Sequence, residues 1–199
     1  MNNILYTIGH STHSIEFFIE LLKAHNIQAI ADVRSSPFSK FNPQFNRENL
    51  MKSLSDENIS YIFLGKELGA RRDENECYDD DKVNYTAISK TPAFLEGVKR
   101  LKLGVSKMRV ALMCAEKDPL TCHRSILICR FTSSLFKCIH ILEDGTTEDG
   151  ESAESRLLKE TKLDDGDLFA TLEDRLSQAY QKRESKIAYT EKSSSDESN

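Results

Sequence analysis

The sequence predicts an α/β fold, a single domain with a mostly parallel sheet of about five strands flanked by helices on both faces. Short apolar runs alternate along the chain with longer segments in which apolar residues recur at helical spacing. Runs such as residues 110–113 are apolar at consecutive positions, which is typical of strands covered on both faces. Helices that connect strands in this alternation form right-handed crossovers and leave the strands parallel.

The first half of the chain contains three of the expected strands. Residues 5–8 form a short apolar run, and Ser14 then precedes a helical pattern, so we expect a strand followed by a helix capped by Ser14. Residues 27–33 predict the second strand and residues 47–54 a helix. The third strand is expected at residues 59–64.

The second half of the chain begins with residues 65–72, which include Arg71 and Arg72. An acidic, polar segment follows, residues 73–82, which has no apolar period and is expected to be an exposed loop. Residues 84–103 have a helical pattern in which Pro92 should begin a second helix. Residues 109–114 and residues 137–142 are the fourth and fifth strands, with a further helix between them.

The helix after the fourth strand is expected to begin beside reactive side chains. Asp118 can cap it, and Pro119 suits its first position because the N–H that proline lacks would be unpaired there. Its first turn then carries Cys122, His123 and Arg124. The N–H groups at a helix start favour an anion and lower the pKa of a nearby thiol, which predicts a reactive or ligand-binding site.

Three parts of the chain differ in composition. Residues 1–145 should form the α/β domain, residues 146–185 a helical extension with fewer apolar residues, and residues 186–199 a disordered acidic and serine-rich tail. Residues 143–199 hold 8 Lys and Arg against 16 Asp and Glu, whereas the rest of the chain holds 19 against 16. The acidic tail is therefore a candidate for binding a protein partner.

The composition, with 39% hydrophobic and 30% charged residues, is that of a soluble globular protein. There is no apolar run long enough for a membrane span and no basic and apolar leader at the N-terminus, so we expect a cytoplasmic protein without membrane contact. Three of the five cysteines, Cys114, Cys129 and Cys138, lie in apolar runs, which agrees with reduced thiols in a reducing compartment.

Four of the expected strands are followed directly by unusual polar groups. These groups are residues 9–11, 32–37, 69–72 and 114–124. The carboxyl ends of parallel strands meet at one edge of a sheet, where ligands bind, so these groups should converge on one site.

The residue types at this edge favour an anion such as phosphate. The candidate anion-binding residues are Ser11, Arg34, Ser35, Arg71, Arg72, His123 and Arg124. Surface ion pairs with neighbouring Asp and Glu are the alternative role for the arginines.

The candidate catalytic residues are Glu116, Cys122, His10 and Asp32. Glu116 and Asp32 could act as acid or base or could hold the arginines in place, and Cys122 is either a nucleophile or a packing residue. A cysteine-dependent phosphatase loop has its arginine six residues after the cysteine. That position is Leu120 when counted from Cys114 and Ile128 when counted from Cys122, which excludes that mechanism.

The sequence requires no cofactor. Cys114, Cys122 and His123, joined by His10, are a possible zinc site, but their spacing matches no closed structural zinc pattern and there is no Cys-x-x-Cys pair. A zinc site is therefore the less favoured alternative.

Four motifs in the same order resemble a bacterial and archaeal family called domain of unknown function 488. They are Thr7-Ile8-Gly9-His10-Ser11; Asp32-Val33-Arg34 with Pro37 and Ser39; Leu68-Gly69 with Arg71 and Arg72; and Leu112-Met113-Cys114-Ala115-Glu116 with Cys122-His123-Arg124. The resemblance covers approximately residues 4–145 and implies one α/β domain with these residues clustered, in a family without an established reaction. Ala70 departs from the family pattern, which usually has a second glycine there.

The leading hypothesis is an enzyme, a hydrolase or transferase, that acts on a phosphate-bearing substrate such as a nucleotide or a nucleic acid. One alternative is a non-catalytic module that binds or senses an anion or nucleotide in the same pocket. Another is a sensor of metal or redox state that uses the Cys and His residues.

Overall fold

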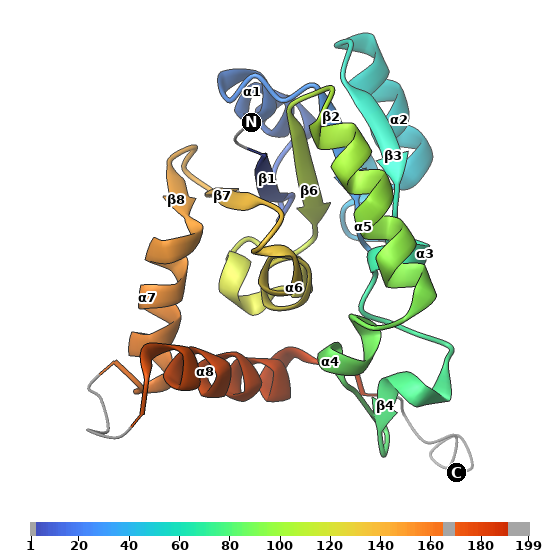
Figure 1. Ribbon diagram of the computed structural model, residues 1–199. Helices are drawn as coiled ribbons and strands as arrows, with labels where there is room; N and C mark the ends of the chain where they lie inside the picture. Colours follow the sequence, from blue (N-terminus) through green and yellow to red (C-terminus); the bar gives the residue numbers. More distant parts are fainter. Residues whose placement is uncertain (1–2, 165–169, 191–199) are drawn as a thin grey trace.

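The computed structural model of the protein describes residues 3–164 and 170–190, and it confirms the α/β class (Figure 1). Its main sheet has the order β3-β2-β6-β1-β7-β8, in which the first five strands are parallel and β8 is antiparallel to β7. These strands are β1 (Ile4–Gly9), β2 (Ala29–Asp32), β3 (Ser60–Phe63), β6 (Val110–Cys114), β7 (Lys137–Ile141) and β8 (Thr147–Asp149). The five parallel strands match the five that the sequence predicts.

Helices cover both faces of this sheet (Figure 1). They are α1 (Ile15–Ala24), α2 (Arg47–Asp56), α3 (Gly65–Leu68), α4 (Tyr85–Ile88), α5 (Pro92–Val105), α6 (Arg130–Thr132), α7 (Gly150–Thr161) and α8 (Leu172–Ile187). Strand β6 shows the two cores clearly. Ala111 and Met113 pack with α1 and α2, whereas Val110 and Leu112 face the core that contains α5.

Two helices begin where the sequence predicts, after the cap Ser14 and at Pro92. The Ser14 hydroxyl accepts a hydrogen bond from the Phe17 N–H at 3.2 Å, and the Thr91 hydroxyl accepts one from Phe94 at 3.2 Å, with Pro92 as the first residue of α5. Each cap gives a partner to a backbone N–H that the helix itself cannot pair.

The segment after β6 is not the single helix that the sequence predicts. Asp118 does cap a helix, but this is a 3-10 turn, Pro119–Thr121, and Cys122 after it has extended backbone. A second, π-type helical segment then covers Arg124–Cys129 and continues into α6. Because the Cys122 carbonyl accepts the N–H groups of the next turn, Cys122 lies at the start of the second helix rather than inside the first.

The polar segment 73–82 is more structured than predicted. It follows α3 and forms most of a small hairpin of β4 (Tyr78–Asp79) and β5 (Lys82–Val83). Cys77 and Val83 anchor the hairpin in the core, and two buried residues so far apart leave no apolar period in the sequence.

The C-terminal part belongs to the same structure as the rest of the chain. Strand β8 extends the sheet beyond residue 145, and α8 contacts both helical segments that follow β6 (Figure 1). The prediction of disorder from residue 186 was wrong for residues 186–190, because the Tyr189 carbonyl accepts the Val83 N–H at 3.0 Å and Thr190 bridges to Lys82. The rest of that tail, residues 191–199, lies outside the described residues.

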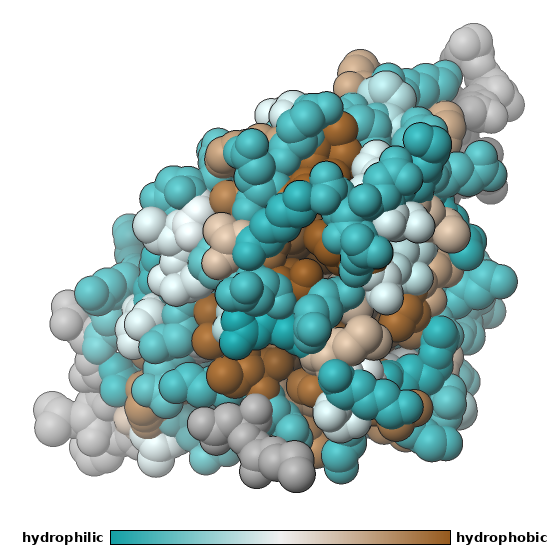
Figure 2. All heavy atoms as spheres, turned by 90° about the horizontal axis from the view of Figure 1, so that it is seen from above, coloured by the Kyte–Doolittle hydropathy of each residue, from teal (hydrophilic) through white to brown (hydrophobic). Residues whose placement is uncertain are grey.

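The surface of the molecule is mainly hydrophilic when it is seen from above, with apolar side chains showing between the polar ones (Figure 2). Among the described residues, no helix combines the length and the apolar character that a membrane crossing would need.

Buried His140 on β7 should make the fold sensitive to acid. Its Nδ1 lies 2.8 Å from the Thr7 hydroxyl, and burial lowers the pKa of His140 from 6.5 to about 4. The unfolded chain therefore binds a proton at a pH where the folded protein does not, so stability falls as the pH drops from about 6.5 to 4. Over this pH range, the free energy of unfolding of His140→Gln should fall by about 2–3 kcal/mol less than that of the unsubstituted protein.

Urea unfolding at a series of pH values measures this effect. The control is His25→Gln, because His25 is only half-buried and donates to the Gly145 carbonyl. Equal pH dependence in His140→Gln and the unsubstituted protein would contradict the assignment.

Candidate functional site

A cavity of about 260 Å³ opens at the carboxyl edge of the parallel strands. Its walls come from the segments after β2, α3 and β6 and from the end of α8. The lining residues are Arg34, Ser35, Ser36, Ala70, Arg71, Tyr85, Cys114, Ala115, Glu116, Thr121, Cys122, His123, Ile187 and Tyr189. Three of the four polar groups singled out in the sequence therefore meet here, as expected for parallel strand ends.

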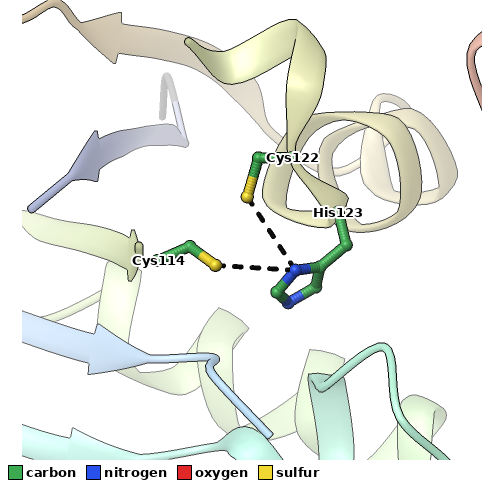
Figure 3. Close-up of side chains that lie close together, drawn as sticks. All are labelled: Cys114, Cys122 and His123. Atoms are coloured by element: carbon green, nitrogen blue, oxygen red, sulfur yellow. Dashed lines mark hydrogen bonds between the residues drawn. The ribbon is translucent and has the colours of Figure 1, made fainter. Parts of the chain in front are cut away.

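One wall of the cavity is a compact cluster of two thiols, an imidazole and a carboxylate. His123 Nδ1 lies 3.6 Å from Cys114 Sγ and 3.8 Å from Cys122 Sγ, and the three side chains point toward one another (Figure 3). Glu116 Oε2 lies 3.0 Å from each sulfur. The other ring nitrogen, His123 Nε2, donates to the Val33 carbonyl at 3.0 Å, which fixes the ring with Nδ1 toward the sulfurs.

The backbone around the cluster explains how the side chains meet. Cys114 is the last residue of β6, and the 3-10 turn brings Cys122 back beside it. The Cys122 sulfur accepts the Arg124 N–H at 3.5 Å, as a capping side chain does at a helix start. The cluster can therefore bind a proton or a metal ion, or stabilise one of its thiols in the ionised form.

The two thiols differ in how readily they ionise, because their pKa values shift in opposite directions. Burial opposes the charge on Cys122, but the hydrogen bond from Cys114 and the positive charge of Arg124 outweigh it and lower the pKa of the Cys122 thiol. The hydrogen bond to Cys122, together with burial, raises the pKa of Cys114. Burial and the neighbouring Cys122 also raise the pKa of Glu116, so this carboxyl group binds a proton more readily than an exposed one.

The cavity lining also includes cationic side chains, of which Arg34 is the first along the chain. Asp32 accepts two side-chain hydrogen bonds from Arg34, at 2.9 and 2.7 Å, and a third from the Tyr61 hydroxyl at 2.8 Å. Arg34 also donates to the Phe45 carbonyl at 2.9 Å and to His10 Nε2 at 3.3 Å. This network holds the guanidinium rigidly beside the cavity.

His10 and Asp32 do not line this cavity, which departs from the catalytic roles expected for them. Asp32 is fully buried behind Arg34. His10 donates from Nδ1 to the Ser11 carbonyl at 2.8 Å and stacks on Phe45, and burial lowers the pKa of His10 to about 4. The polar atoms of both residues are occupied by Arg34 and its surroundings, so both contact Arg34 rather than the cavity.

Arg71 is the second cation at the cavity and is exposed. Its guanidinium lies over the Tyr189 ring, 4.8 Å from the ring centre. Its backbone N–H donates to the Ser35 hydroxyl at 3.0 Å, which joins the segments after α3 and β2. The charged fork of Arg71 has an aromatic neighbour and no ion pair among the described residues, so it is free to bind an anion.

Arg72 and Arg124 were expected to bind an anion, and the structure instead turns both inward. Arg124 is fully buried and donates to the carbonyls of Glu116 and Lys117, at 2.6 and 2.9 Å. Arg72 is also buried and donates to the carbonyls of Lys66 and Glu67, at 2.9 and 3.2 Å. Buried guanidinium groups need such acceptors, so these two arginines shape the loops around the cavity.

Ser11 also lies outside the cavity lining. Its N–H donates to the Ala115 carbonyl at 2.9 Å, which ties the end of β1 to the loop after β6. Sequence reasoning in turn missed Tyr189, Ile187 and Tyr85, which do line the cavity. Tyr189 follows a helix whose path across the molecule leaves no local signal in the sequence.

The comparison with protein families finds one match. The model described as "Domain of unknown function DUF488" matches residues 14–131, which contain most of the cavity lining. Comparisons with curated proteins and with solved structures find no match to the chain.

Proposed function

We propose that this chain, a member of the DUF488 family of domains of unknown function, is an enzyme that acts on a small phosphate-bearing molecule in the cavity beside Arg34 and Arg71. One observation carries the proposal. A single cavity is lined by arginine and serine side chains together with a carboxylate, an imidazole and two thiols. The first set can hold an anion and the second can move protons or bind a reactive group.

The anion would lie between Arg34 and Arg71. Arg34 is fixed by Asp32, and four of its five side-chain N–H groups donate to Asp32, His10 and Phe45, so it offers one N–H and its positive charge. Arg71 keeps its whole fork. Ser35 and Ser36 add hydroxyl groups to the cavity lining. Planar guanidinium groups bind phosphate through pairs of hydrogen bonds, which favours phosphate over a neutral substrate.

The size of the cavity favours a small substrate. At about 260 Å³ it is near the lower limit of ligand pockets, which hold about 300–1,000 Å³. Tyr189 offers aromatic surface that suits a nucleobase, so a mononucleotide is the preferred substrate over a nucleic-acid strand. Glu116 would carry the proton in a hydrolase or transferase reaction, since it shares the cavity with the anion site.

Arg71→Ala should weaken binding of the phosphate-bearing ligand by about 10-fold to 100-fold, because a charge-assisted hydrogen bond contributes about 1.5–3 kcal/mol. Calorimetric titration with a panel of mononucleotides and sugar phosphates measures the change. Arg47→Ala is the matched control. Arg47 is also exposed and lies over an aromatic ring, Phe63, at 4.9 Å, but it does not line the cavity.

Glu116→Gln separates an enzyme from a binding module. We expect this variant to bind the same ligand and to lose turnover, since the amide cannot take up a proton. Two results would contradict the proposal: no member of the panel binds, or Arg71→Ala binds as tightly as Arg47→Ala. Unchanged turnover in Glu116→Gln would remove the catalytic role of this carboxylate.

A further inference from the structure

We propose that Cys114 Sγ, Cys122 Sγ and His123 Nδ1 bind a zinc ion on the wall of the cavity. These are the three residues of the described chain whose ligand atoms cluster in this way, all within 4.8 Å of one another. Figure 3 shows that the side chains come from the end of β6 and from the helix start after the 3-10 turn, and that they point to a common centre. The site stands independently of which substrate the cavity takes.

The distances between the ligand atoms fit a tetrahedral zinc centre. With Zn–S of about 2.3 Å and Zn–N of about 2.0–2.1 Å, a sulfur and a nitrogen ligand lie about 3.6 Å apart. The two sulfur-to-nitrogen distances from His123 are 3.6 and 3.8 Å. An ion could therefore enter with little movement of the side chains.

The orientation of His123 is that of a metal ligand with a supporting partner. Its Nε2–H donates to the Val33 carbonyl at 3.0 Å, so the neutral ring directs the Nδ1 lone pair at the two sulfurs. Metal-binding histidines almost always donate their second ring N–H in this way. The backbone N–H of Arg124, 3.5 Å from Cys122 Sγ, supports the sulfur ligand similarly.

The ligand set selects the metal. Two thiolates and an imidazole favour zinc and disfavour magnesium or calcium, which prefer oxygen ligands. A divalent ion with two thiolates is neutral overall, which suits buried sulfurs, and the protons of the thiols pass to solvent when the metal binds.

Three protein ligands leave the fourth zinc position for water, as in catalytic zinc sites. All three ligands line the cavity, and Glu116 Oε2 accepts hydrogen bonds from both thiols at 3.0 Å, which would free this carboxylate when the thiols lose their protons to bind the ion. Zinc held by these residues would supply an activated water, and in the reaction proposed above Glu116 would be the group of this chain that takes up a proton. Cys122 is then a ligand and not a nucleophile.

Metal content and spectroscopy of the full chain test the site without a substrate. Protein freed of metal with a chelator should bind one zinc ion per chain, measured by competition with a chromogenic chelator. Cobalt(II) in its place should give the intense visible bands of a tetrahedral site and a thiolate charge-transfer band. Absence of zinc binding, or a cobalt spectrum without thiolate bands, would overturn the proposal and leave the nucleotide titration above unaffected.

Ligand variants locate the ion. Cys114→Ser, Cys122→Ser and His123→Gln should each weaken zinc binding by more than about 100-fold, since loss of a merely supporting residue costs about 10–100-fold. Cys138→Ser is the control, because Cys138 is a buried thiol outside the cluster. Zinc binding that persists unchanged in all three variants would also overturn the site, and the cobalt spectrum of the unsubstituted chain decides the matter if a variant fails to fold.

Discussion

Replacement of Arg124 by alanine is expected to destabilise the fold by about 3–5 kcal/mol. The guanidinium is fully buried and donates to the carbonyls of Glu116 and Lys117, at 2.6 and 2.9 Å. Its removal leaves both carbonyls without these donors and creates a cavity beneath the loop that carries Glu116. Denaturant unfolding measures the loss in the free energy of unfolding.

Arg109→Ala is the matched control for Arg124→Ala. Arg109 is exposed and also donates to a backbone carbonyl, that of His25, at 2.9 Å. An exposed arginine of this kind should contribute less than about 1 kcal/mol. A stable Arg124→Ala variant that has lost ligand binding would contradict the structural role and restore Arg124 as a substrate-binding residue.

Gly9→Ala is expected to destabilise the protein by about 3 kcal/mol or more and to displace the Glu116 loop. A Cβ on Gly9 would lie 1.9 Å from the Glu116 carbonyl oxygen and 3.0 Å from the Lys117 Cα. Both are backbone atoms, so no side-chain rotation can relieve the clash. The end of β1 or the loop after β6 must therefore move, and activity should fall together with stability.

Gly104→Ala provides the contrast within the same chain. The added Cβ would make ordinary contact with Val110 Cγ2 at 3.6 Å, and Gly104 lies within α5. We expect this variant to be as stable as the original or more stable by about 0.5–1 kcal/mol, because alanine favours a helix over glycine. Similar thermal unfolding of the Gly9 and Gly104 variants would show that β1 does not depend on this close approach.

The regular elements were largely predictable because their signals are local. The capping residue Ser14 and the apolar period after it predict α1, and Pro92 marks the start of α5. The fully buried strand β6 is recognisable as a continuous apolar run. The π-type segment was not predictable, since it depends on the extended backbone at Cys122 and on contacts that only the folded chain provides.

The position of the cavity followed from the sequence for a topological reason. Parallel strands end at one edge, so the segments that contain Arg34, Arg71 and Cys114 had to lie near one another. The direction in which each charged side chain points did not follow from the sequence. Arg71 and Arg72 are adjacent, yet one faces the cavity and the other donates to carbonyls at the end of α3.

The sequence by itself determined the α/β class, the parallel strands and the edge at which reactive side chains gather, because these depend on local apolar patterns and on the geometry of a parallel sheet. Only the tertiary structure decided that Arg124 donates to the Glu116 carbonyl in the loop after β6 and that His123 turns Nδ1 toward two sulfurs. It also decided that Tyr189 lines the cavity. The physical reason is that each of these contacts joins segments distant in the chain, whose hydrogen-bond partners exist only once the fold has formed.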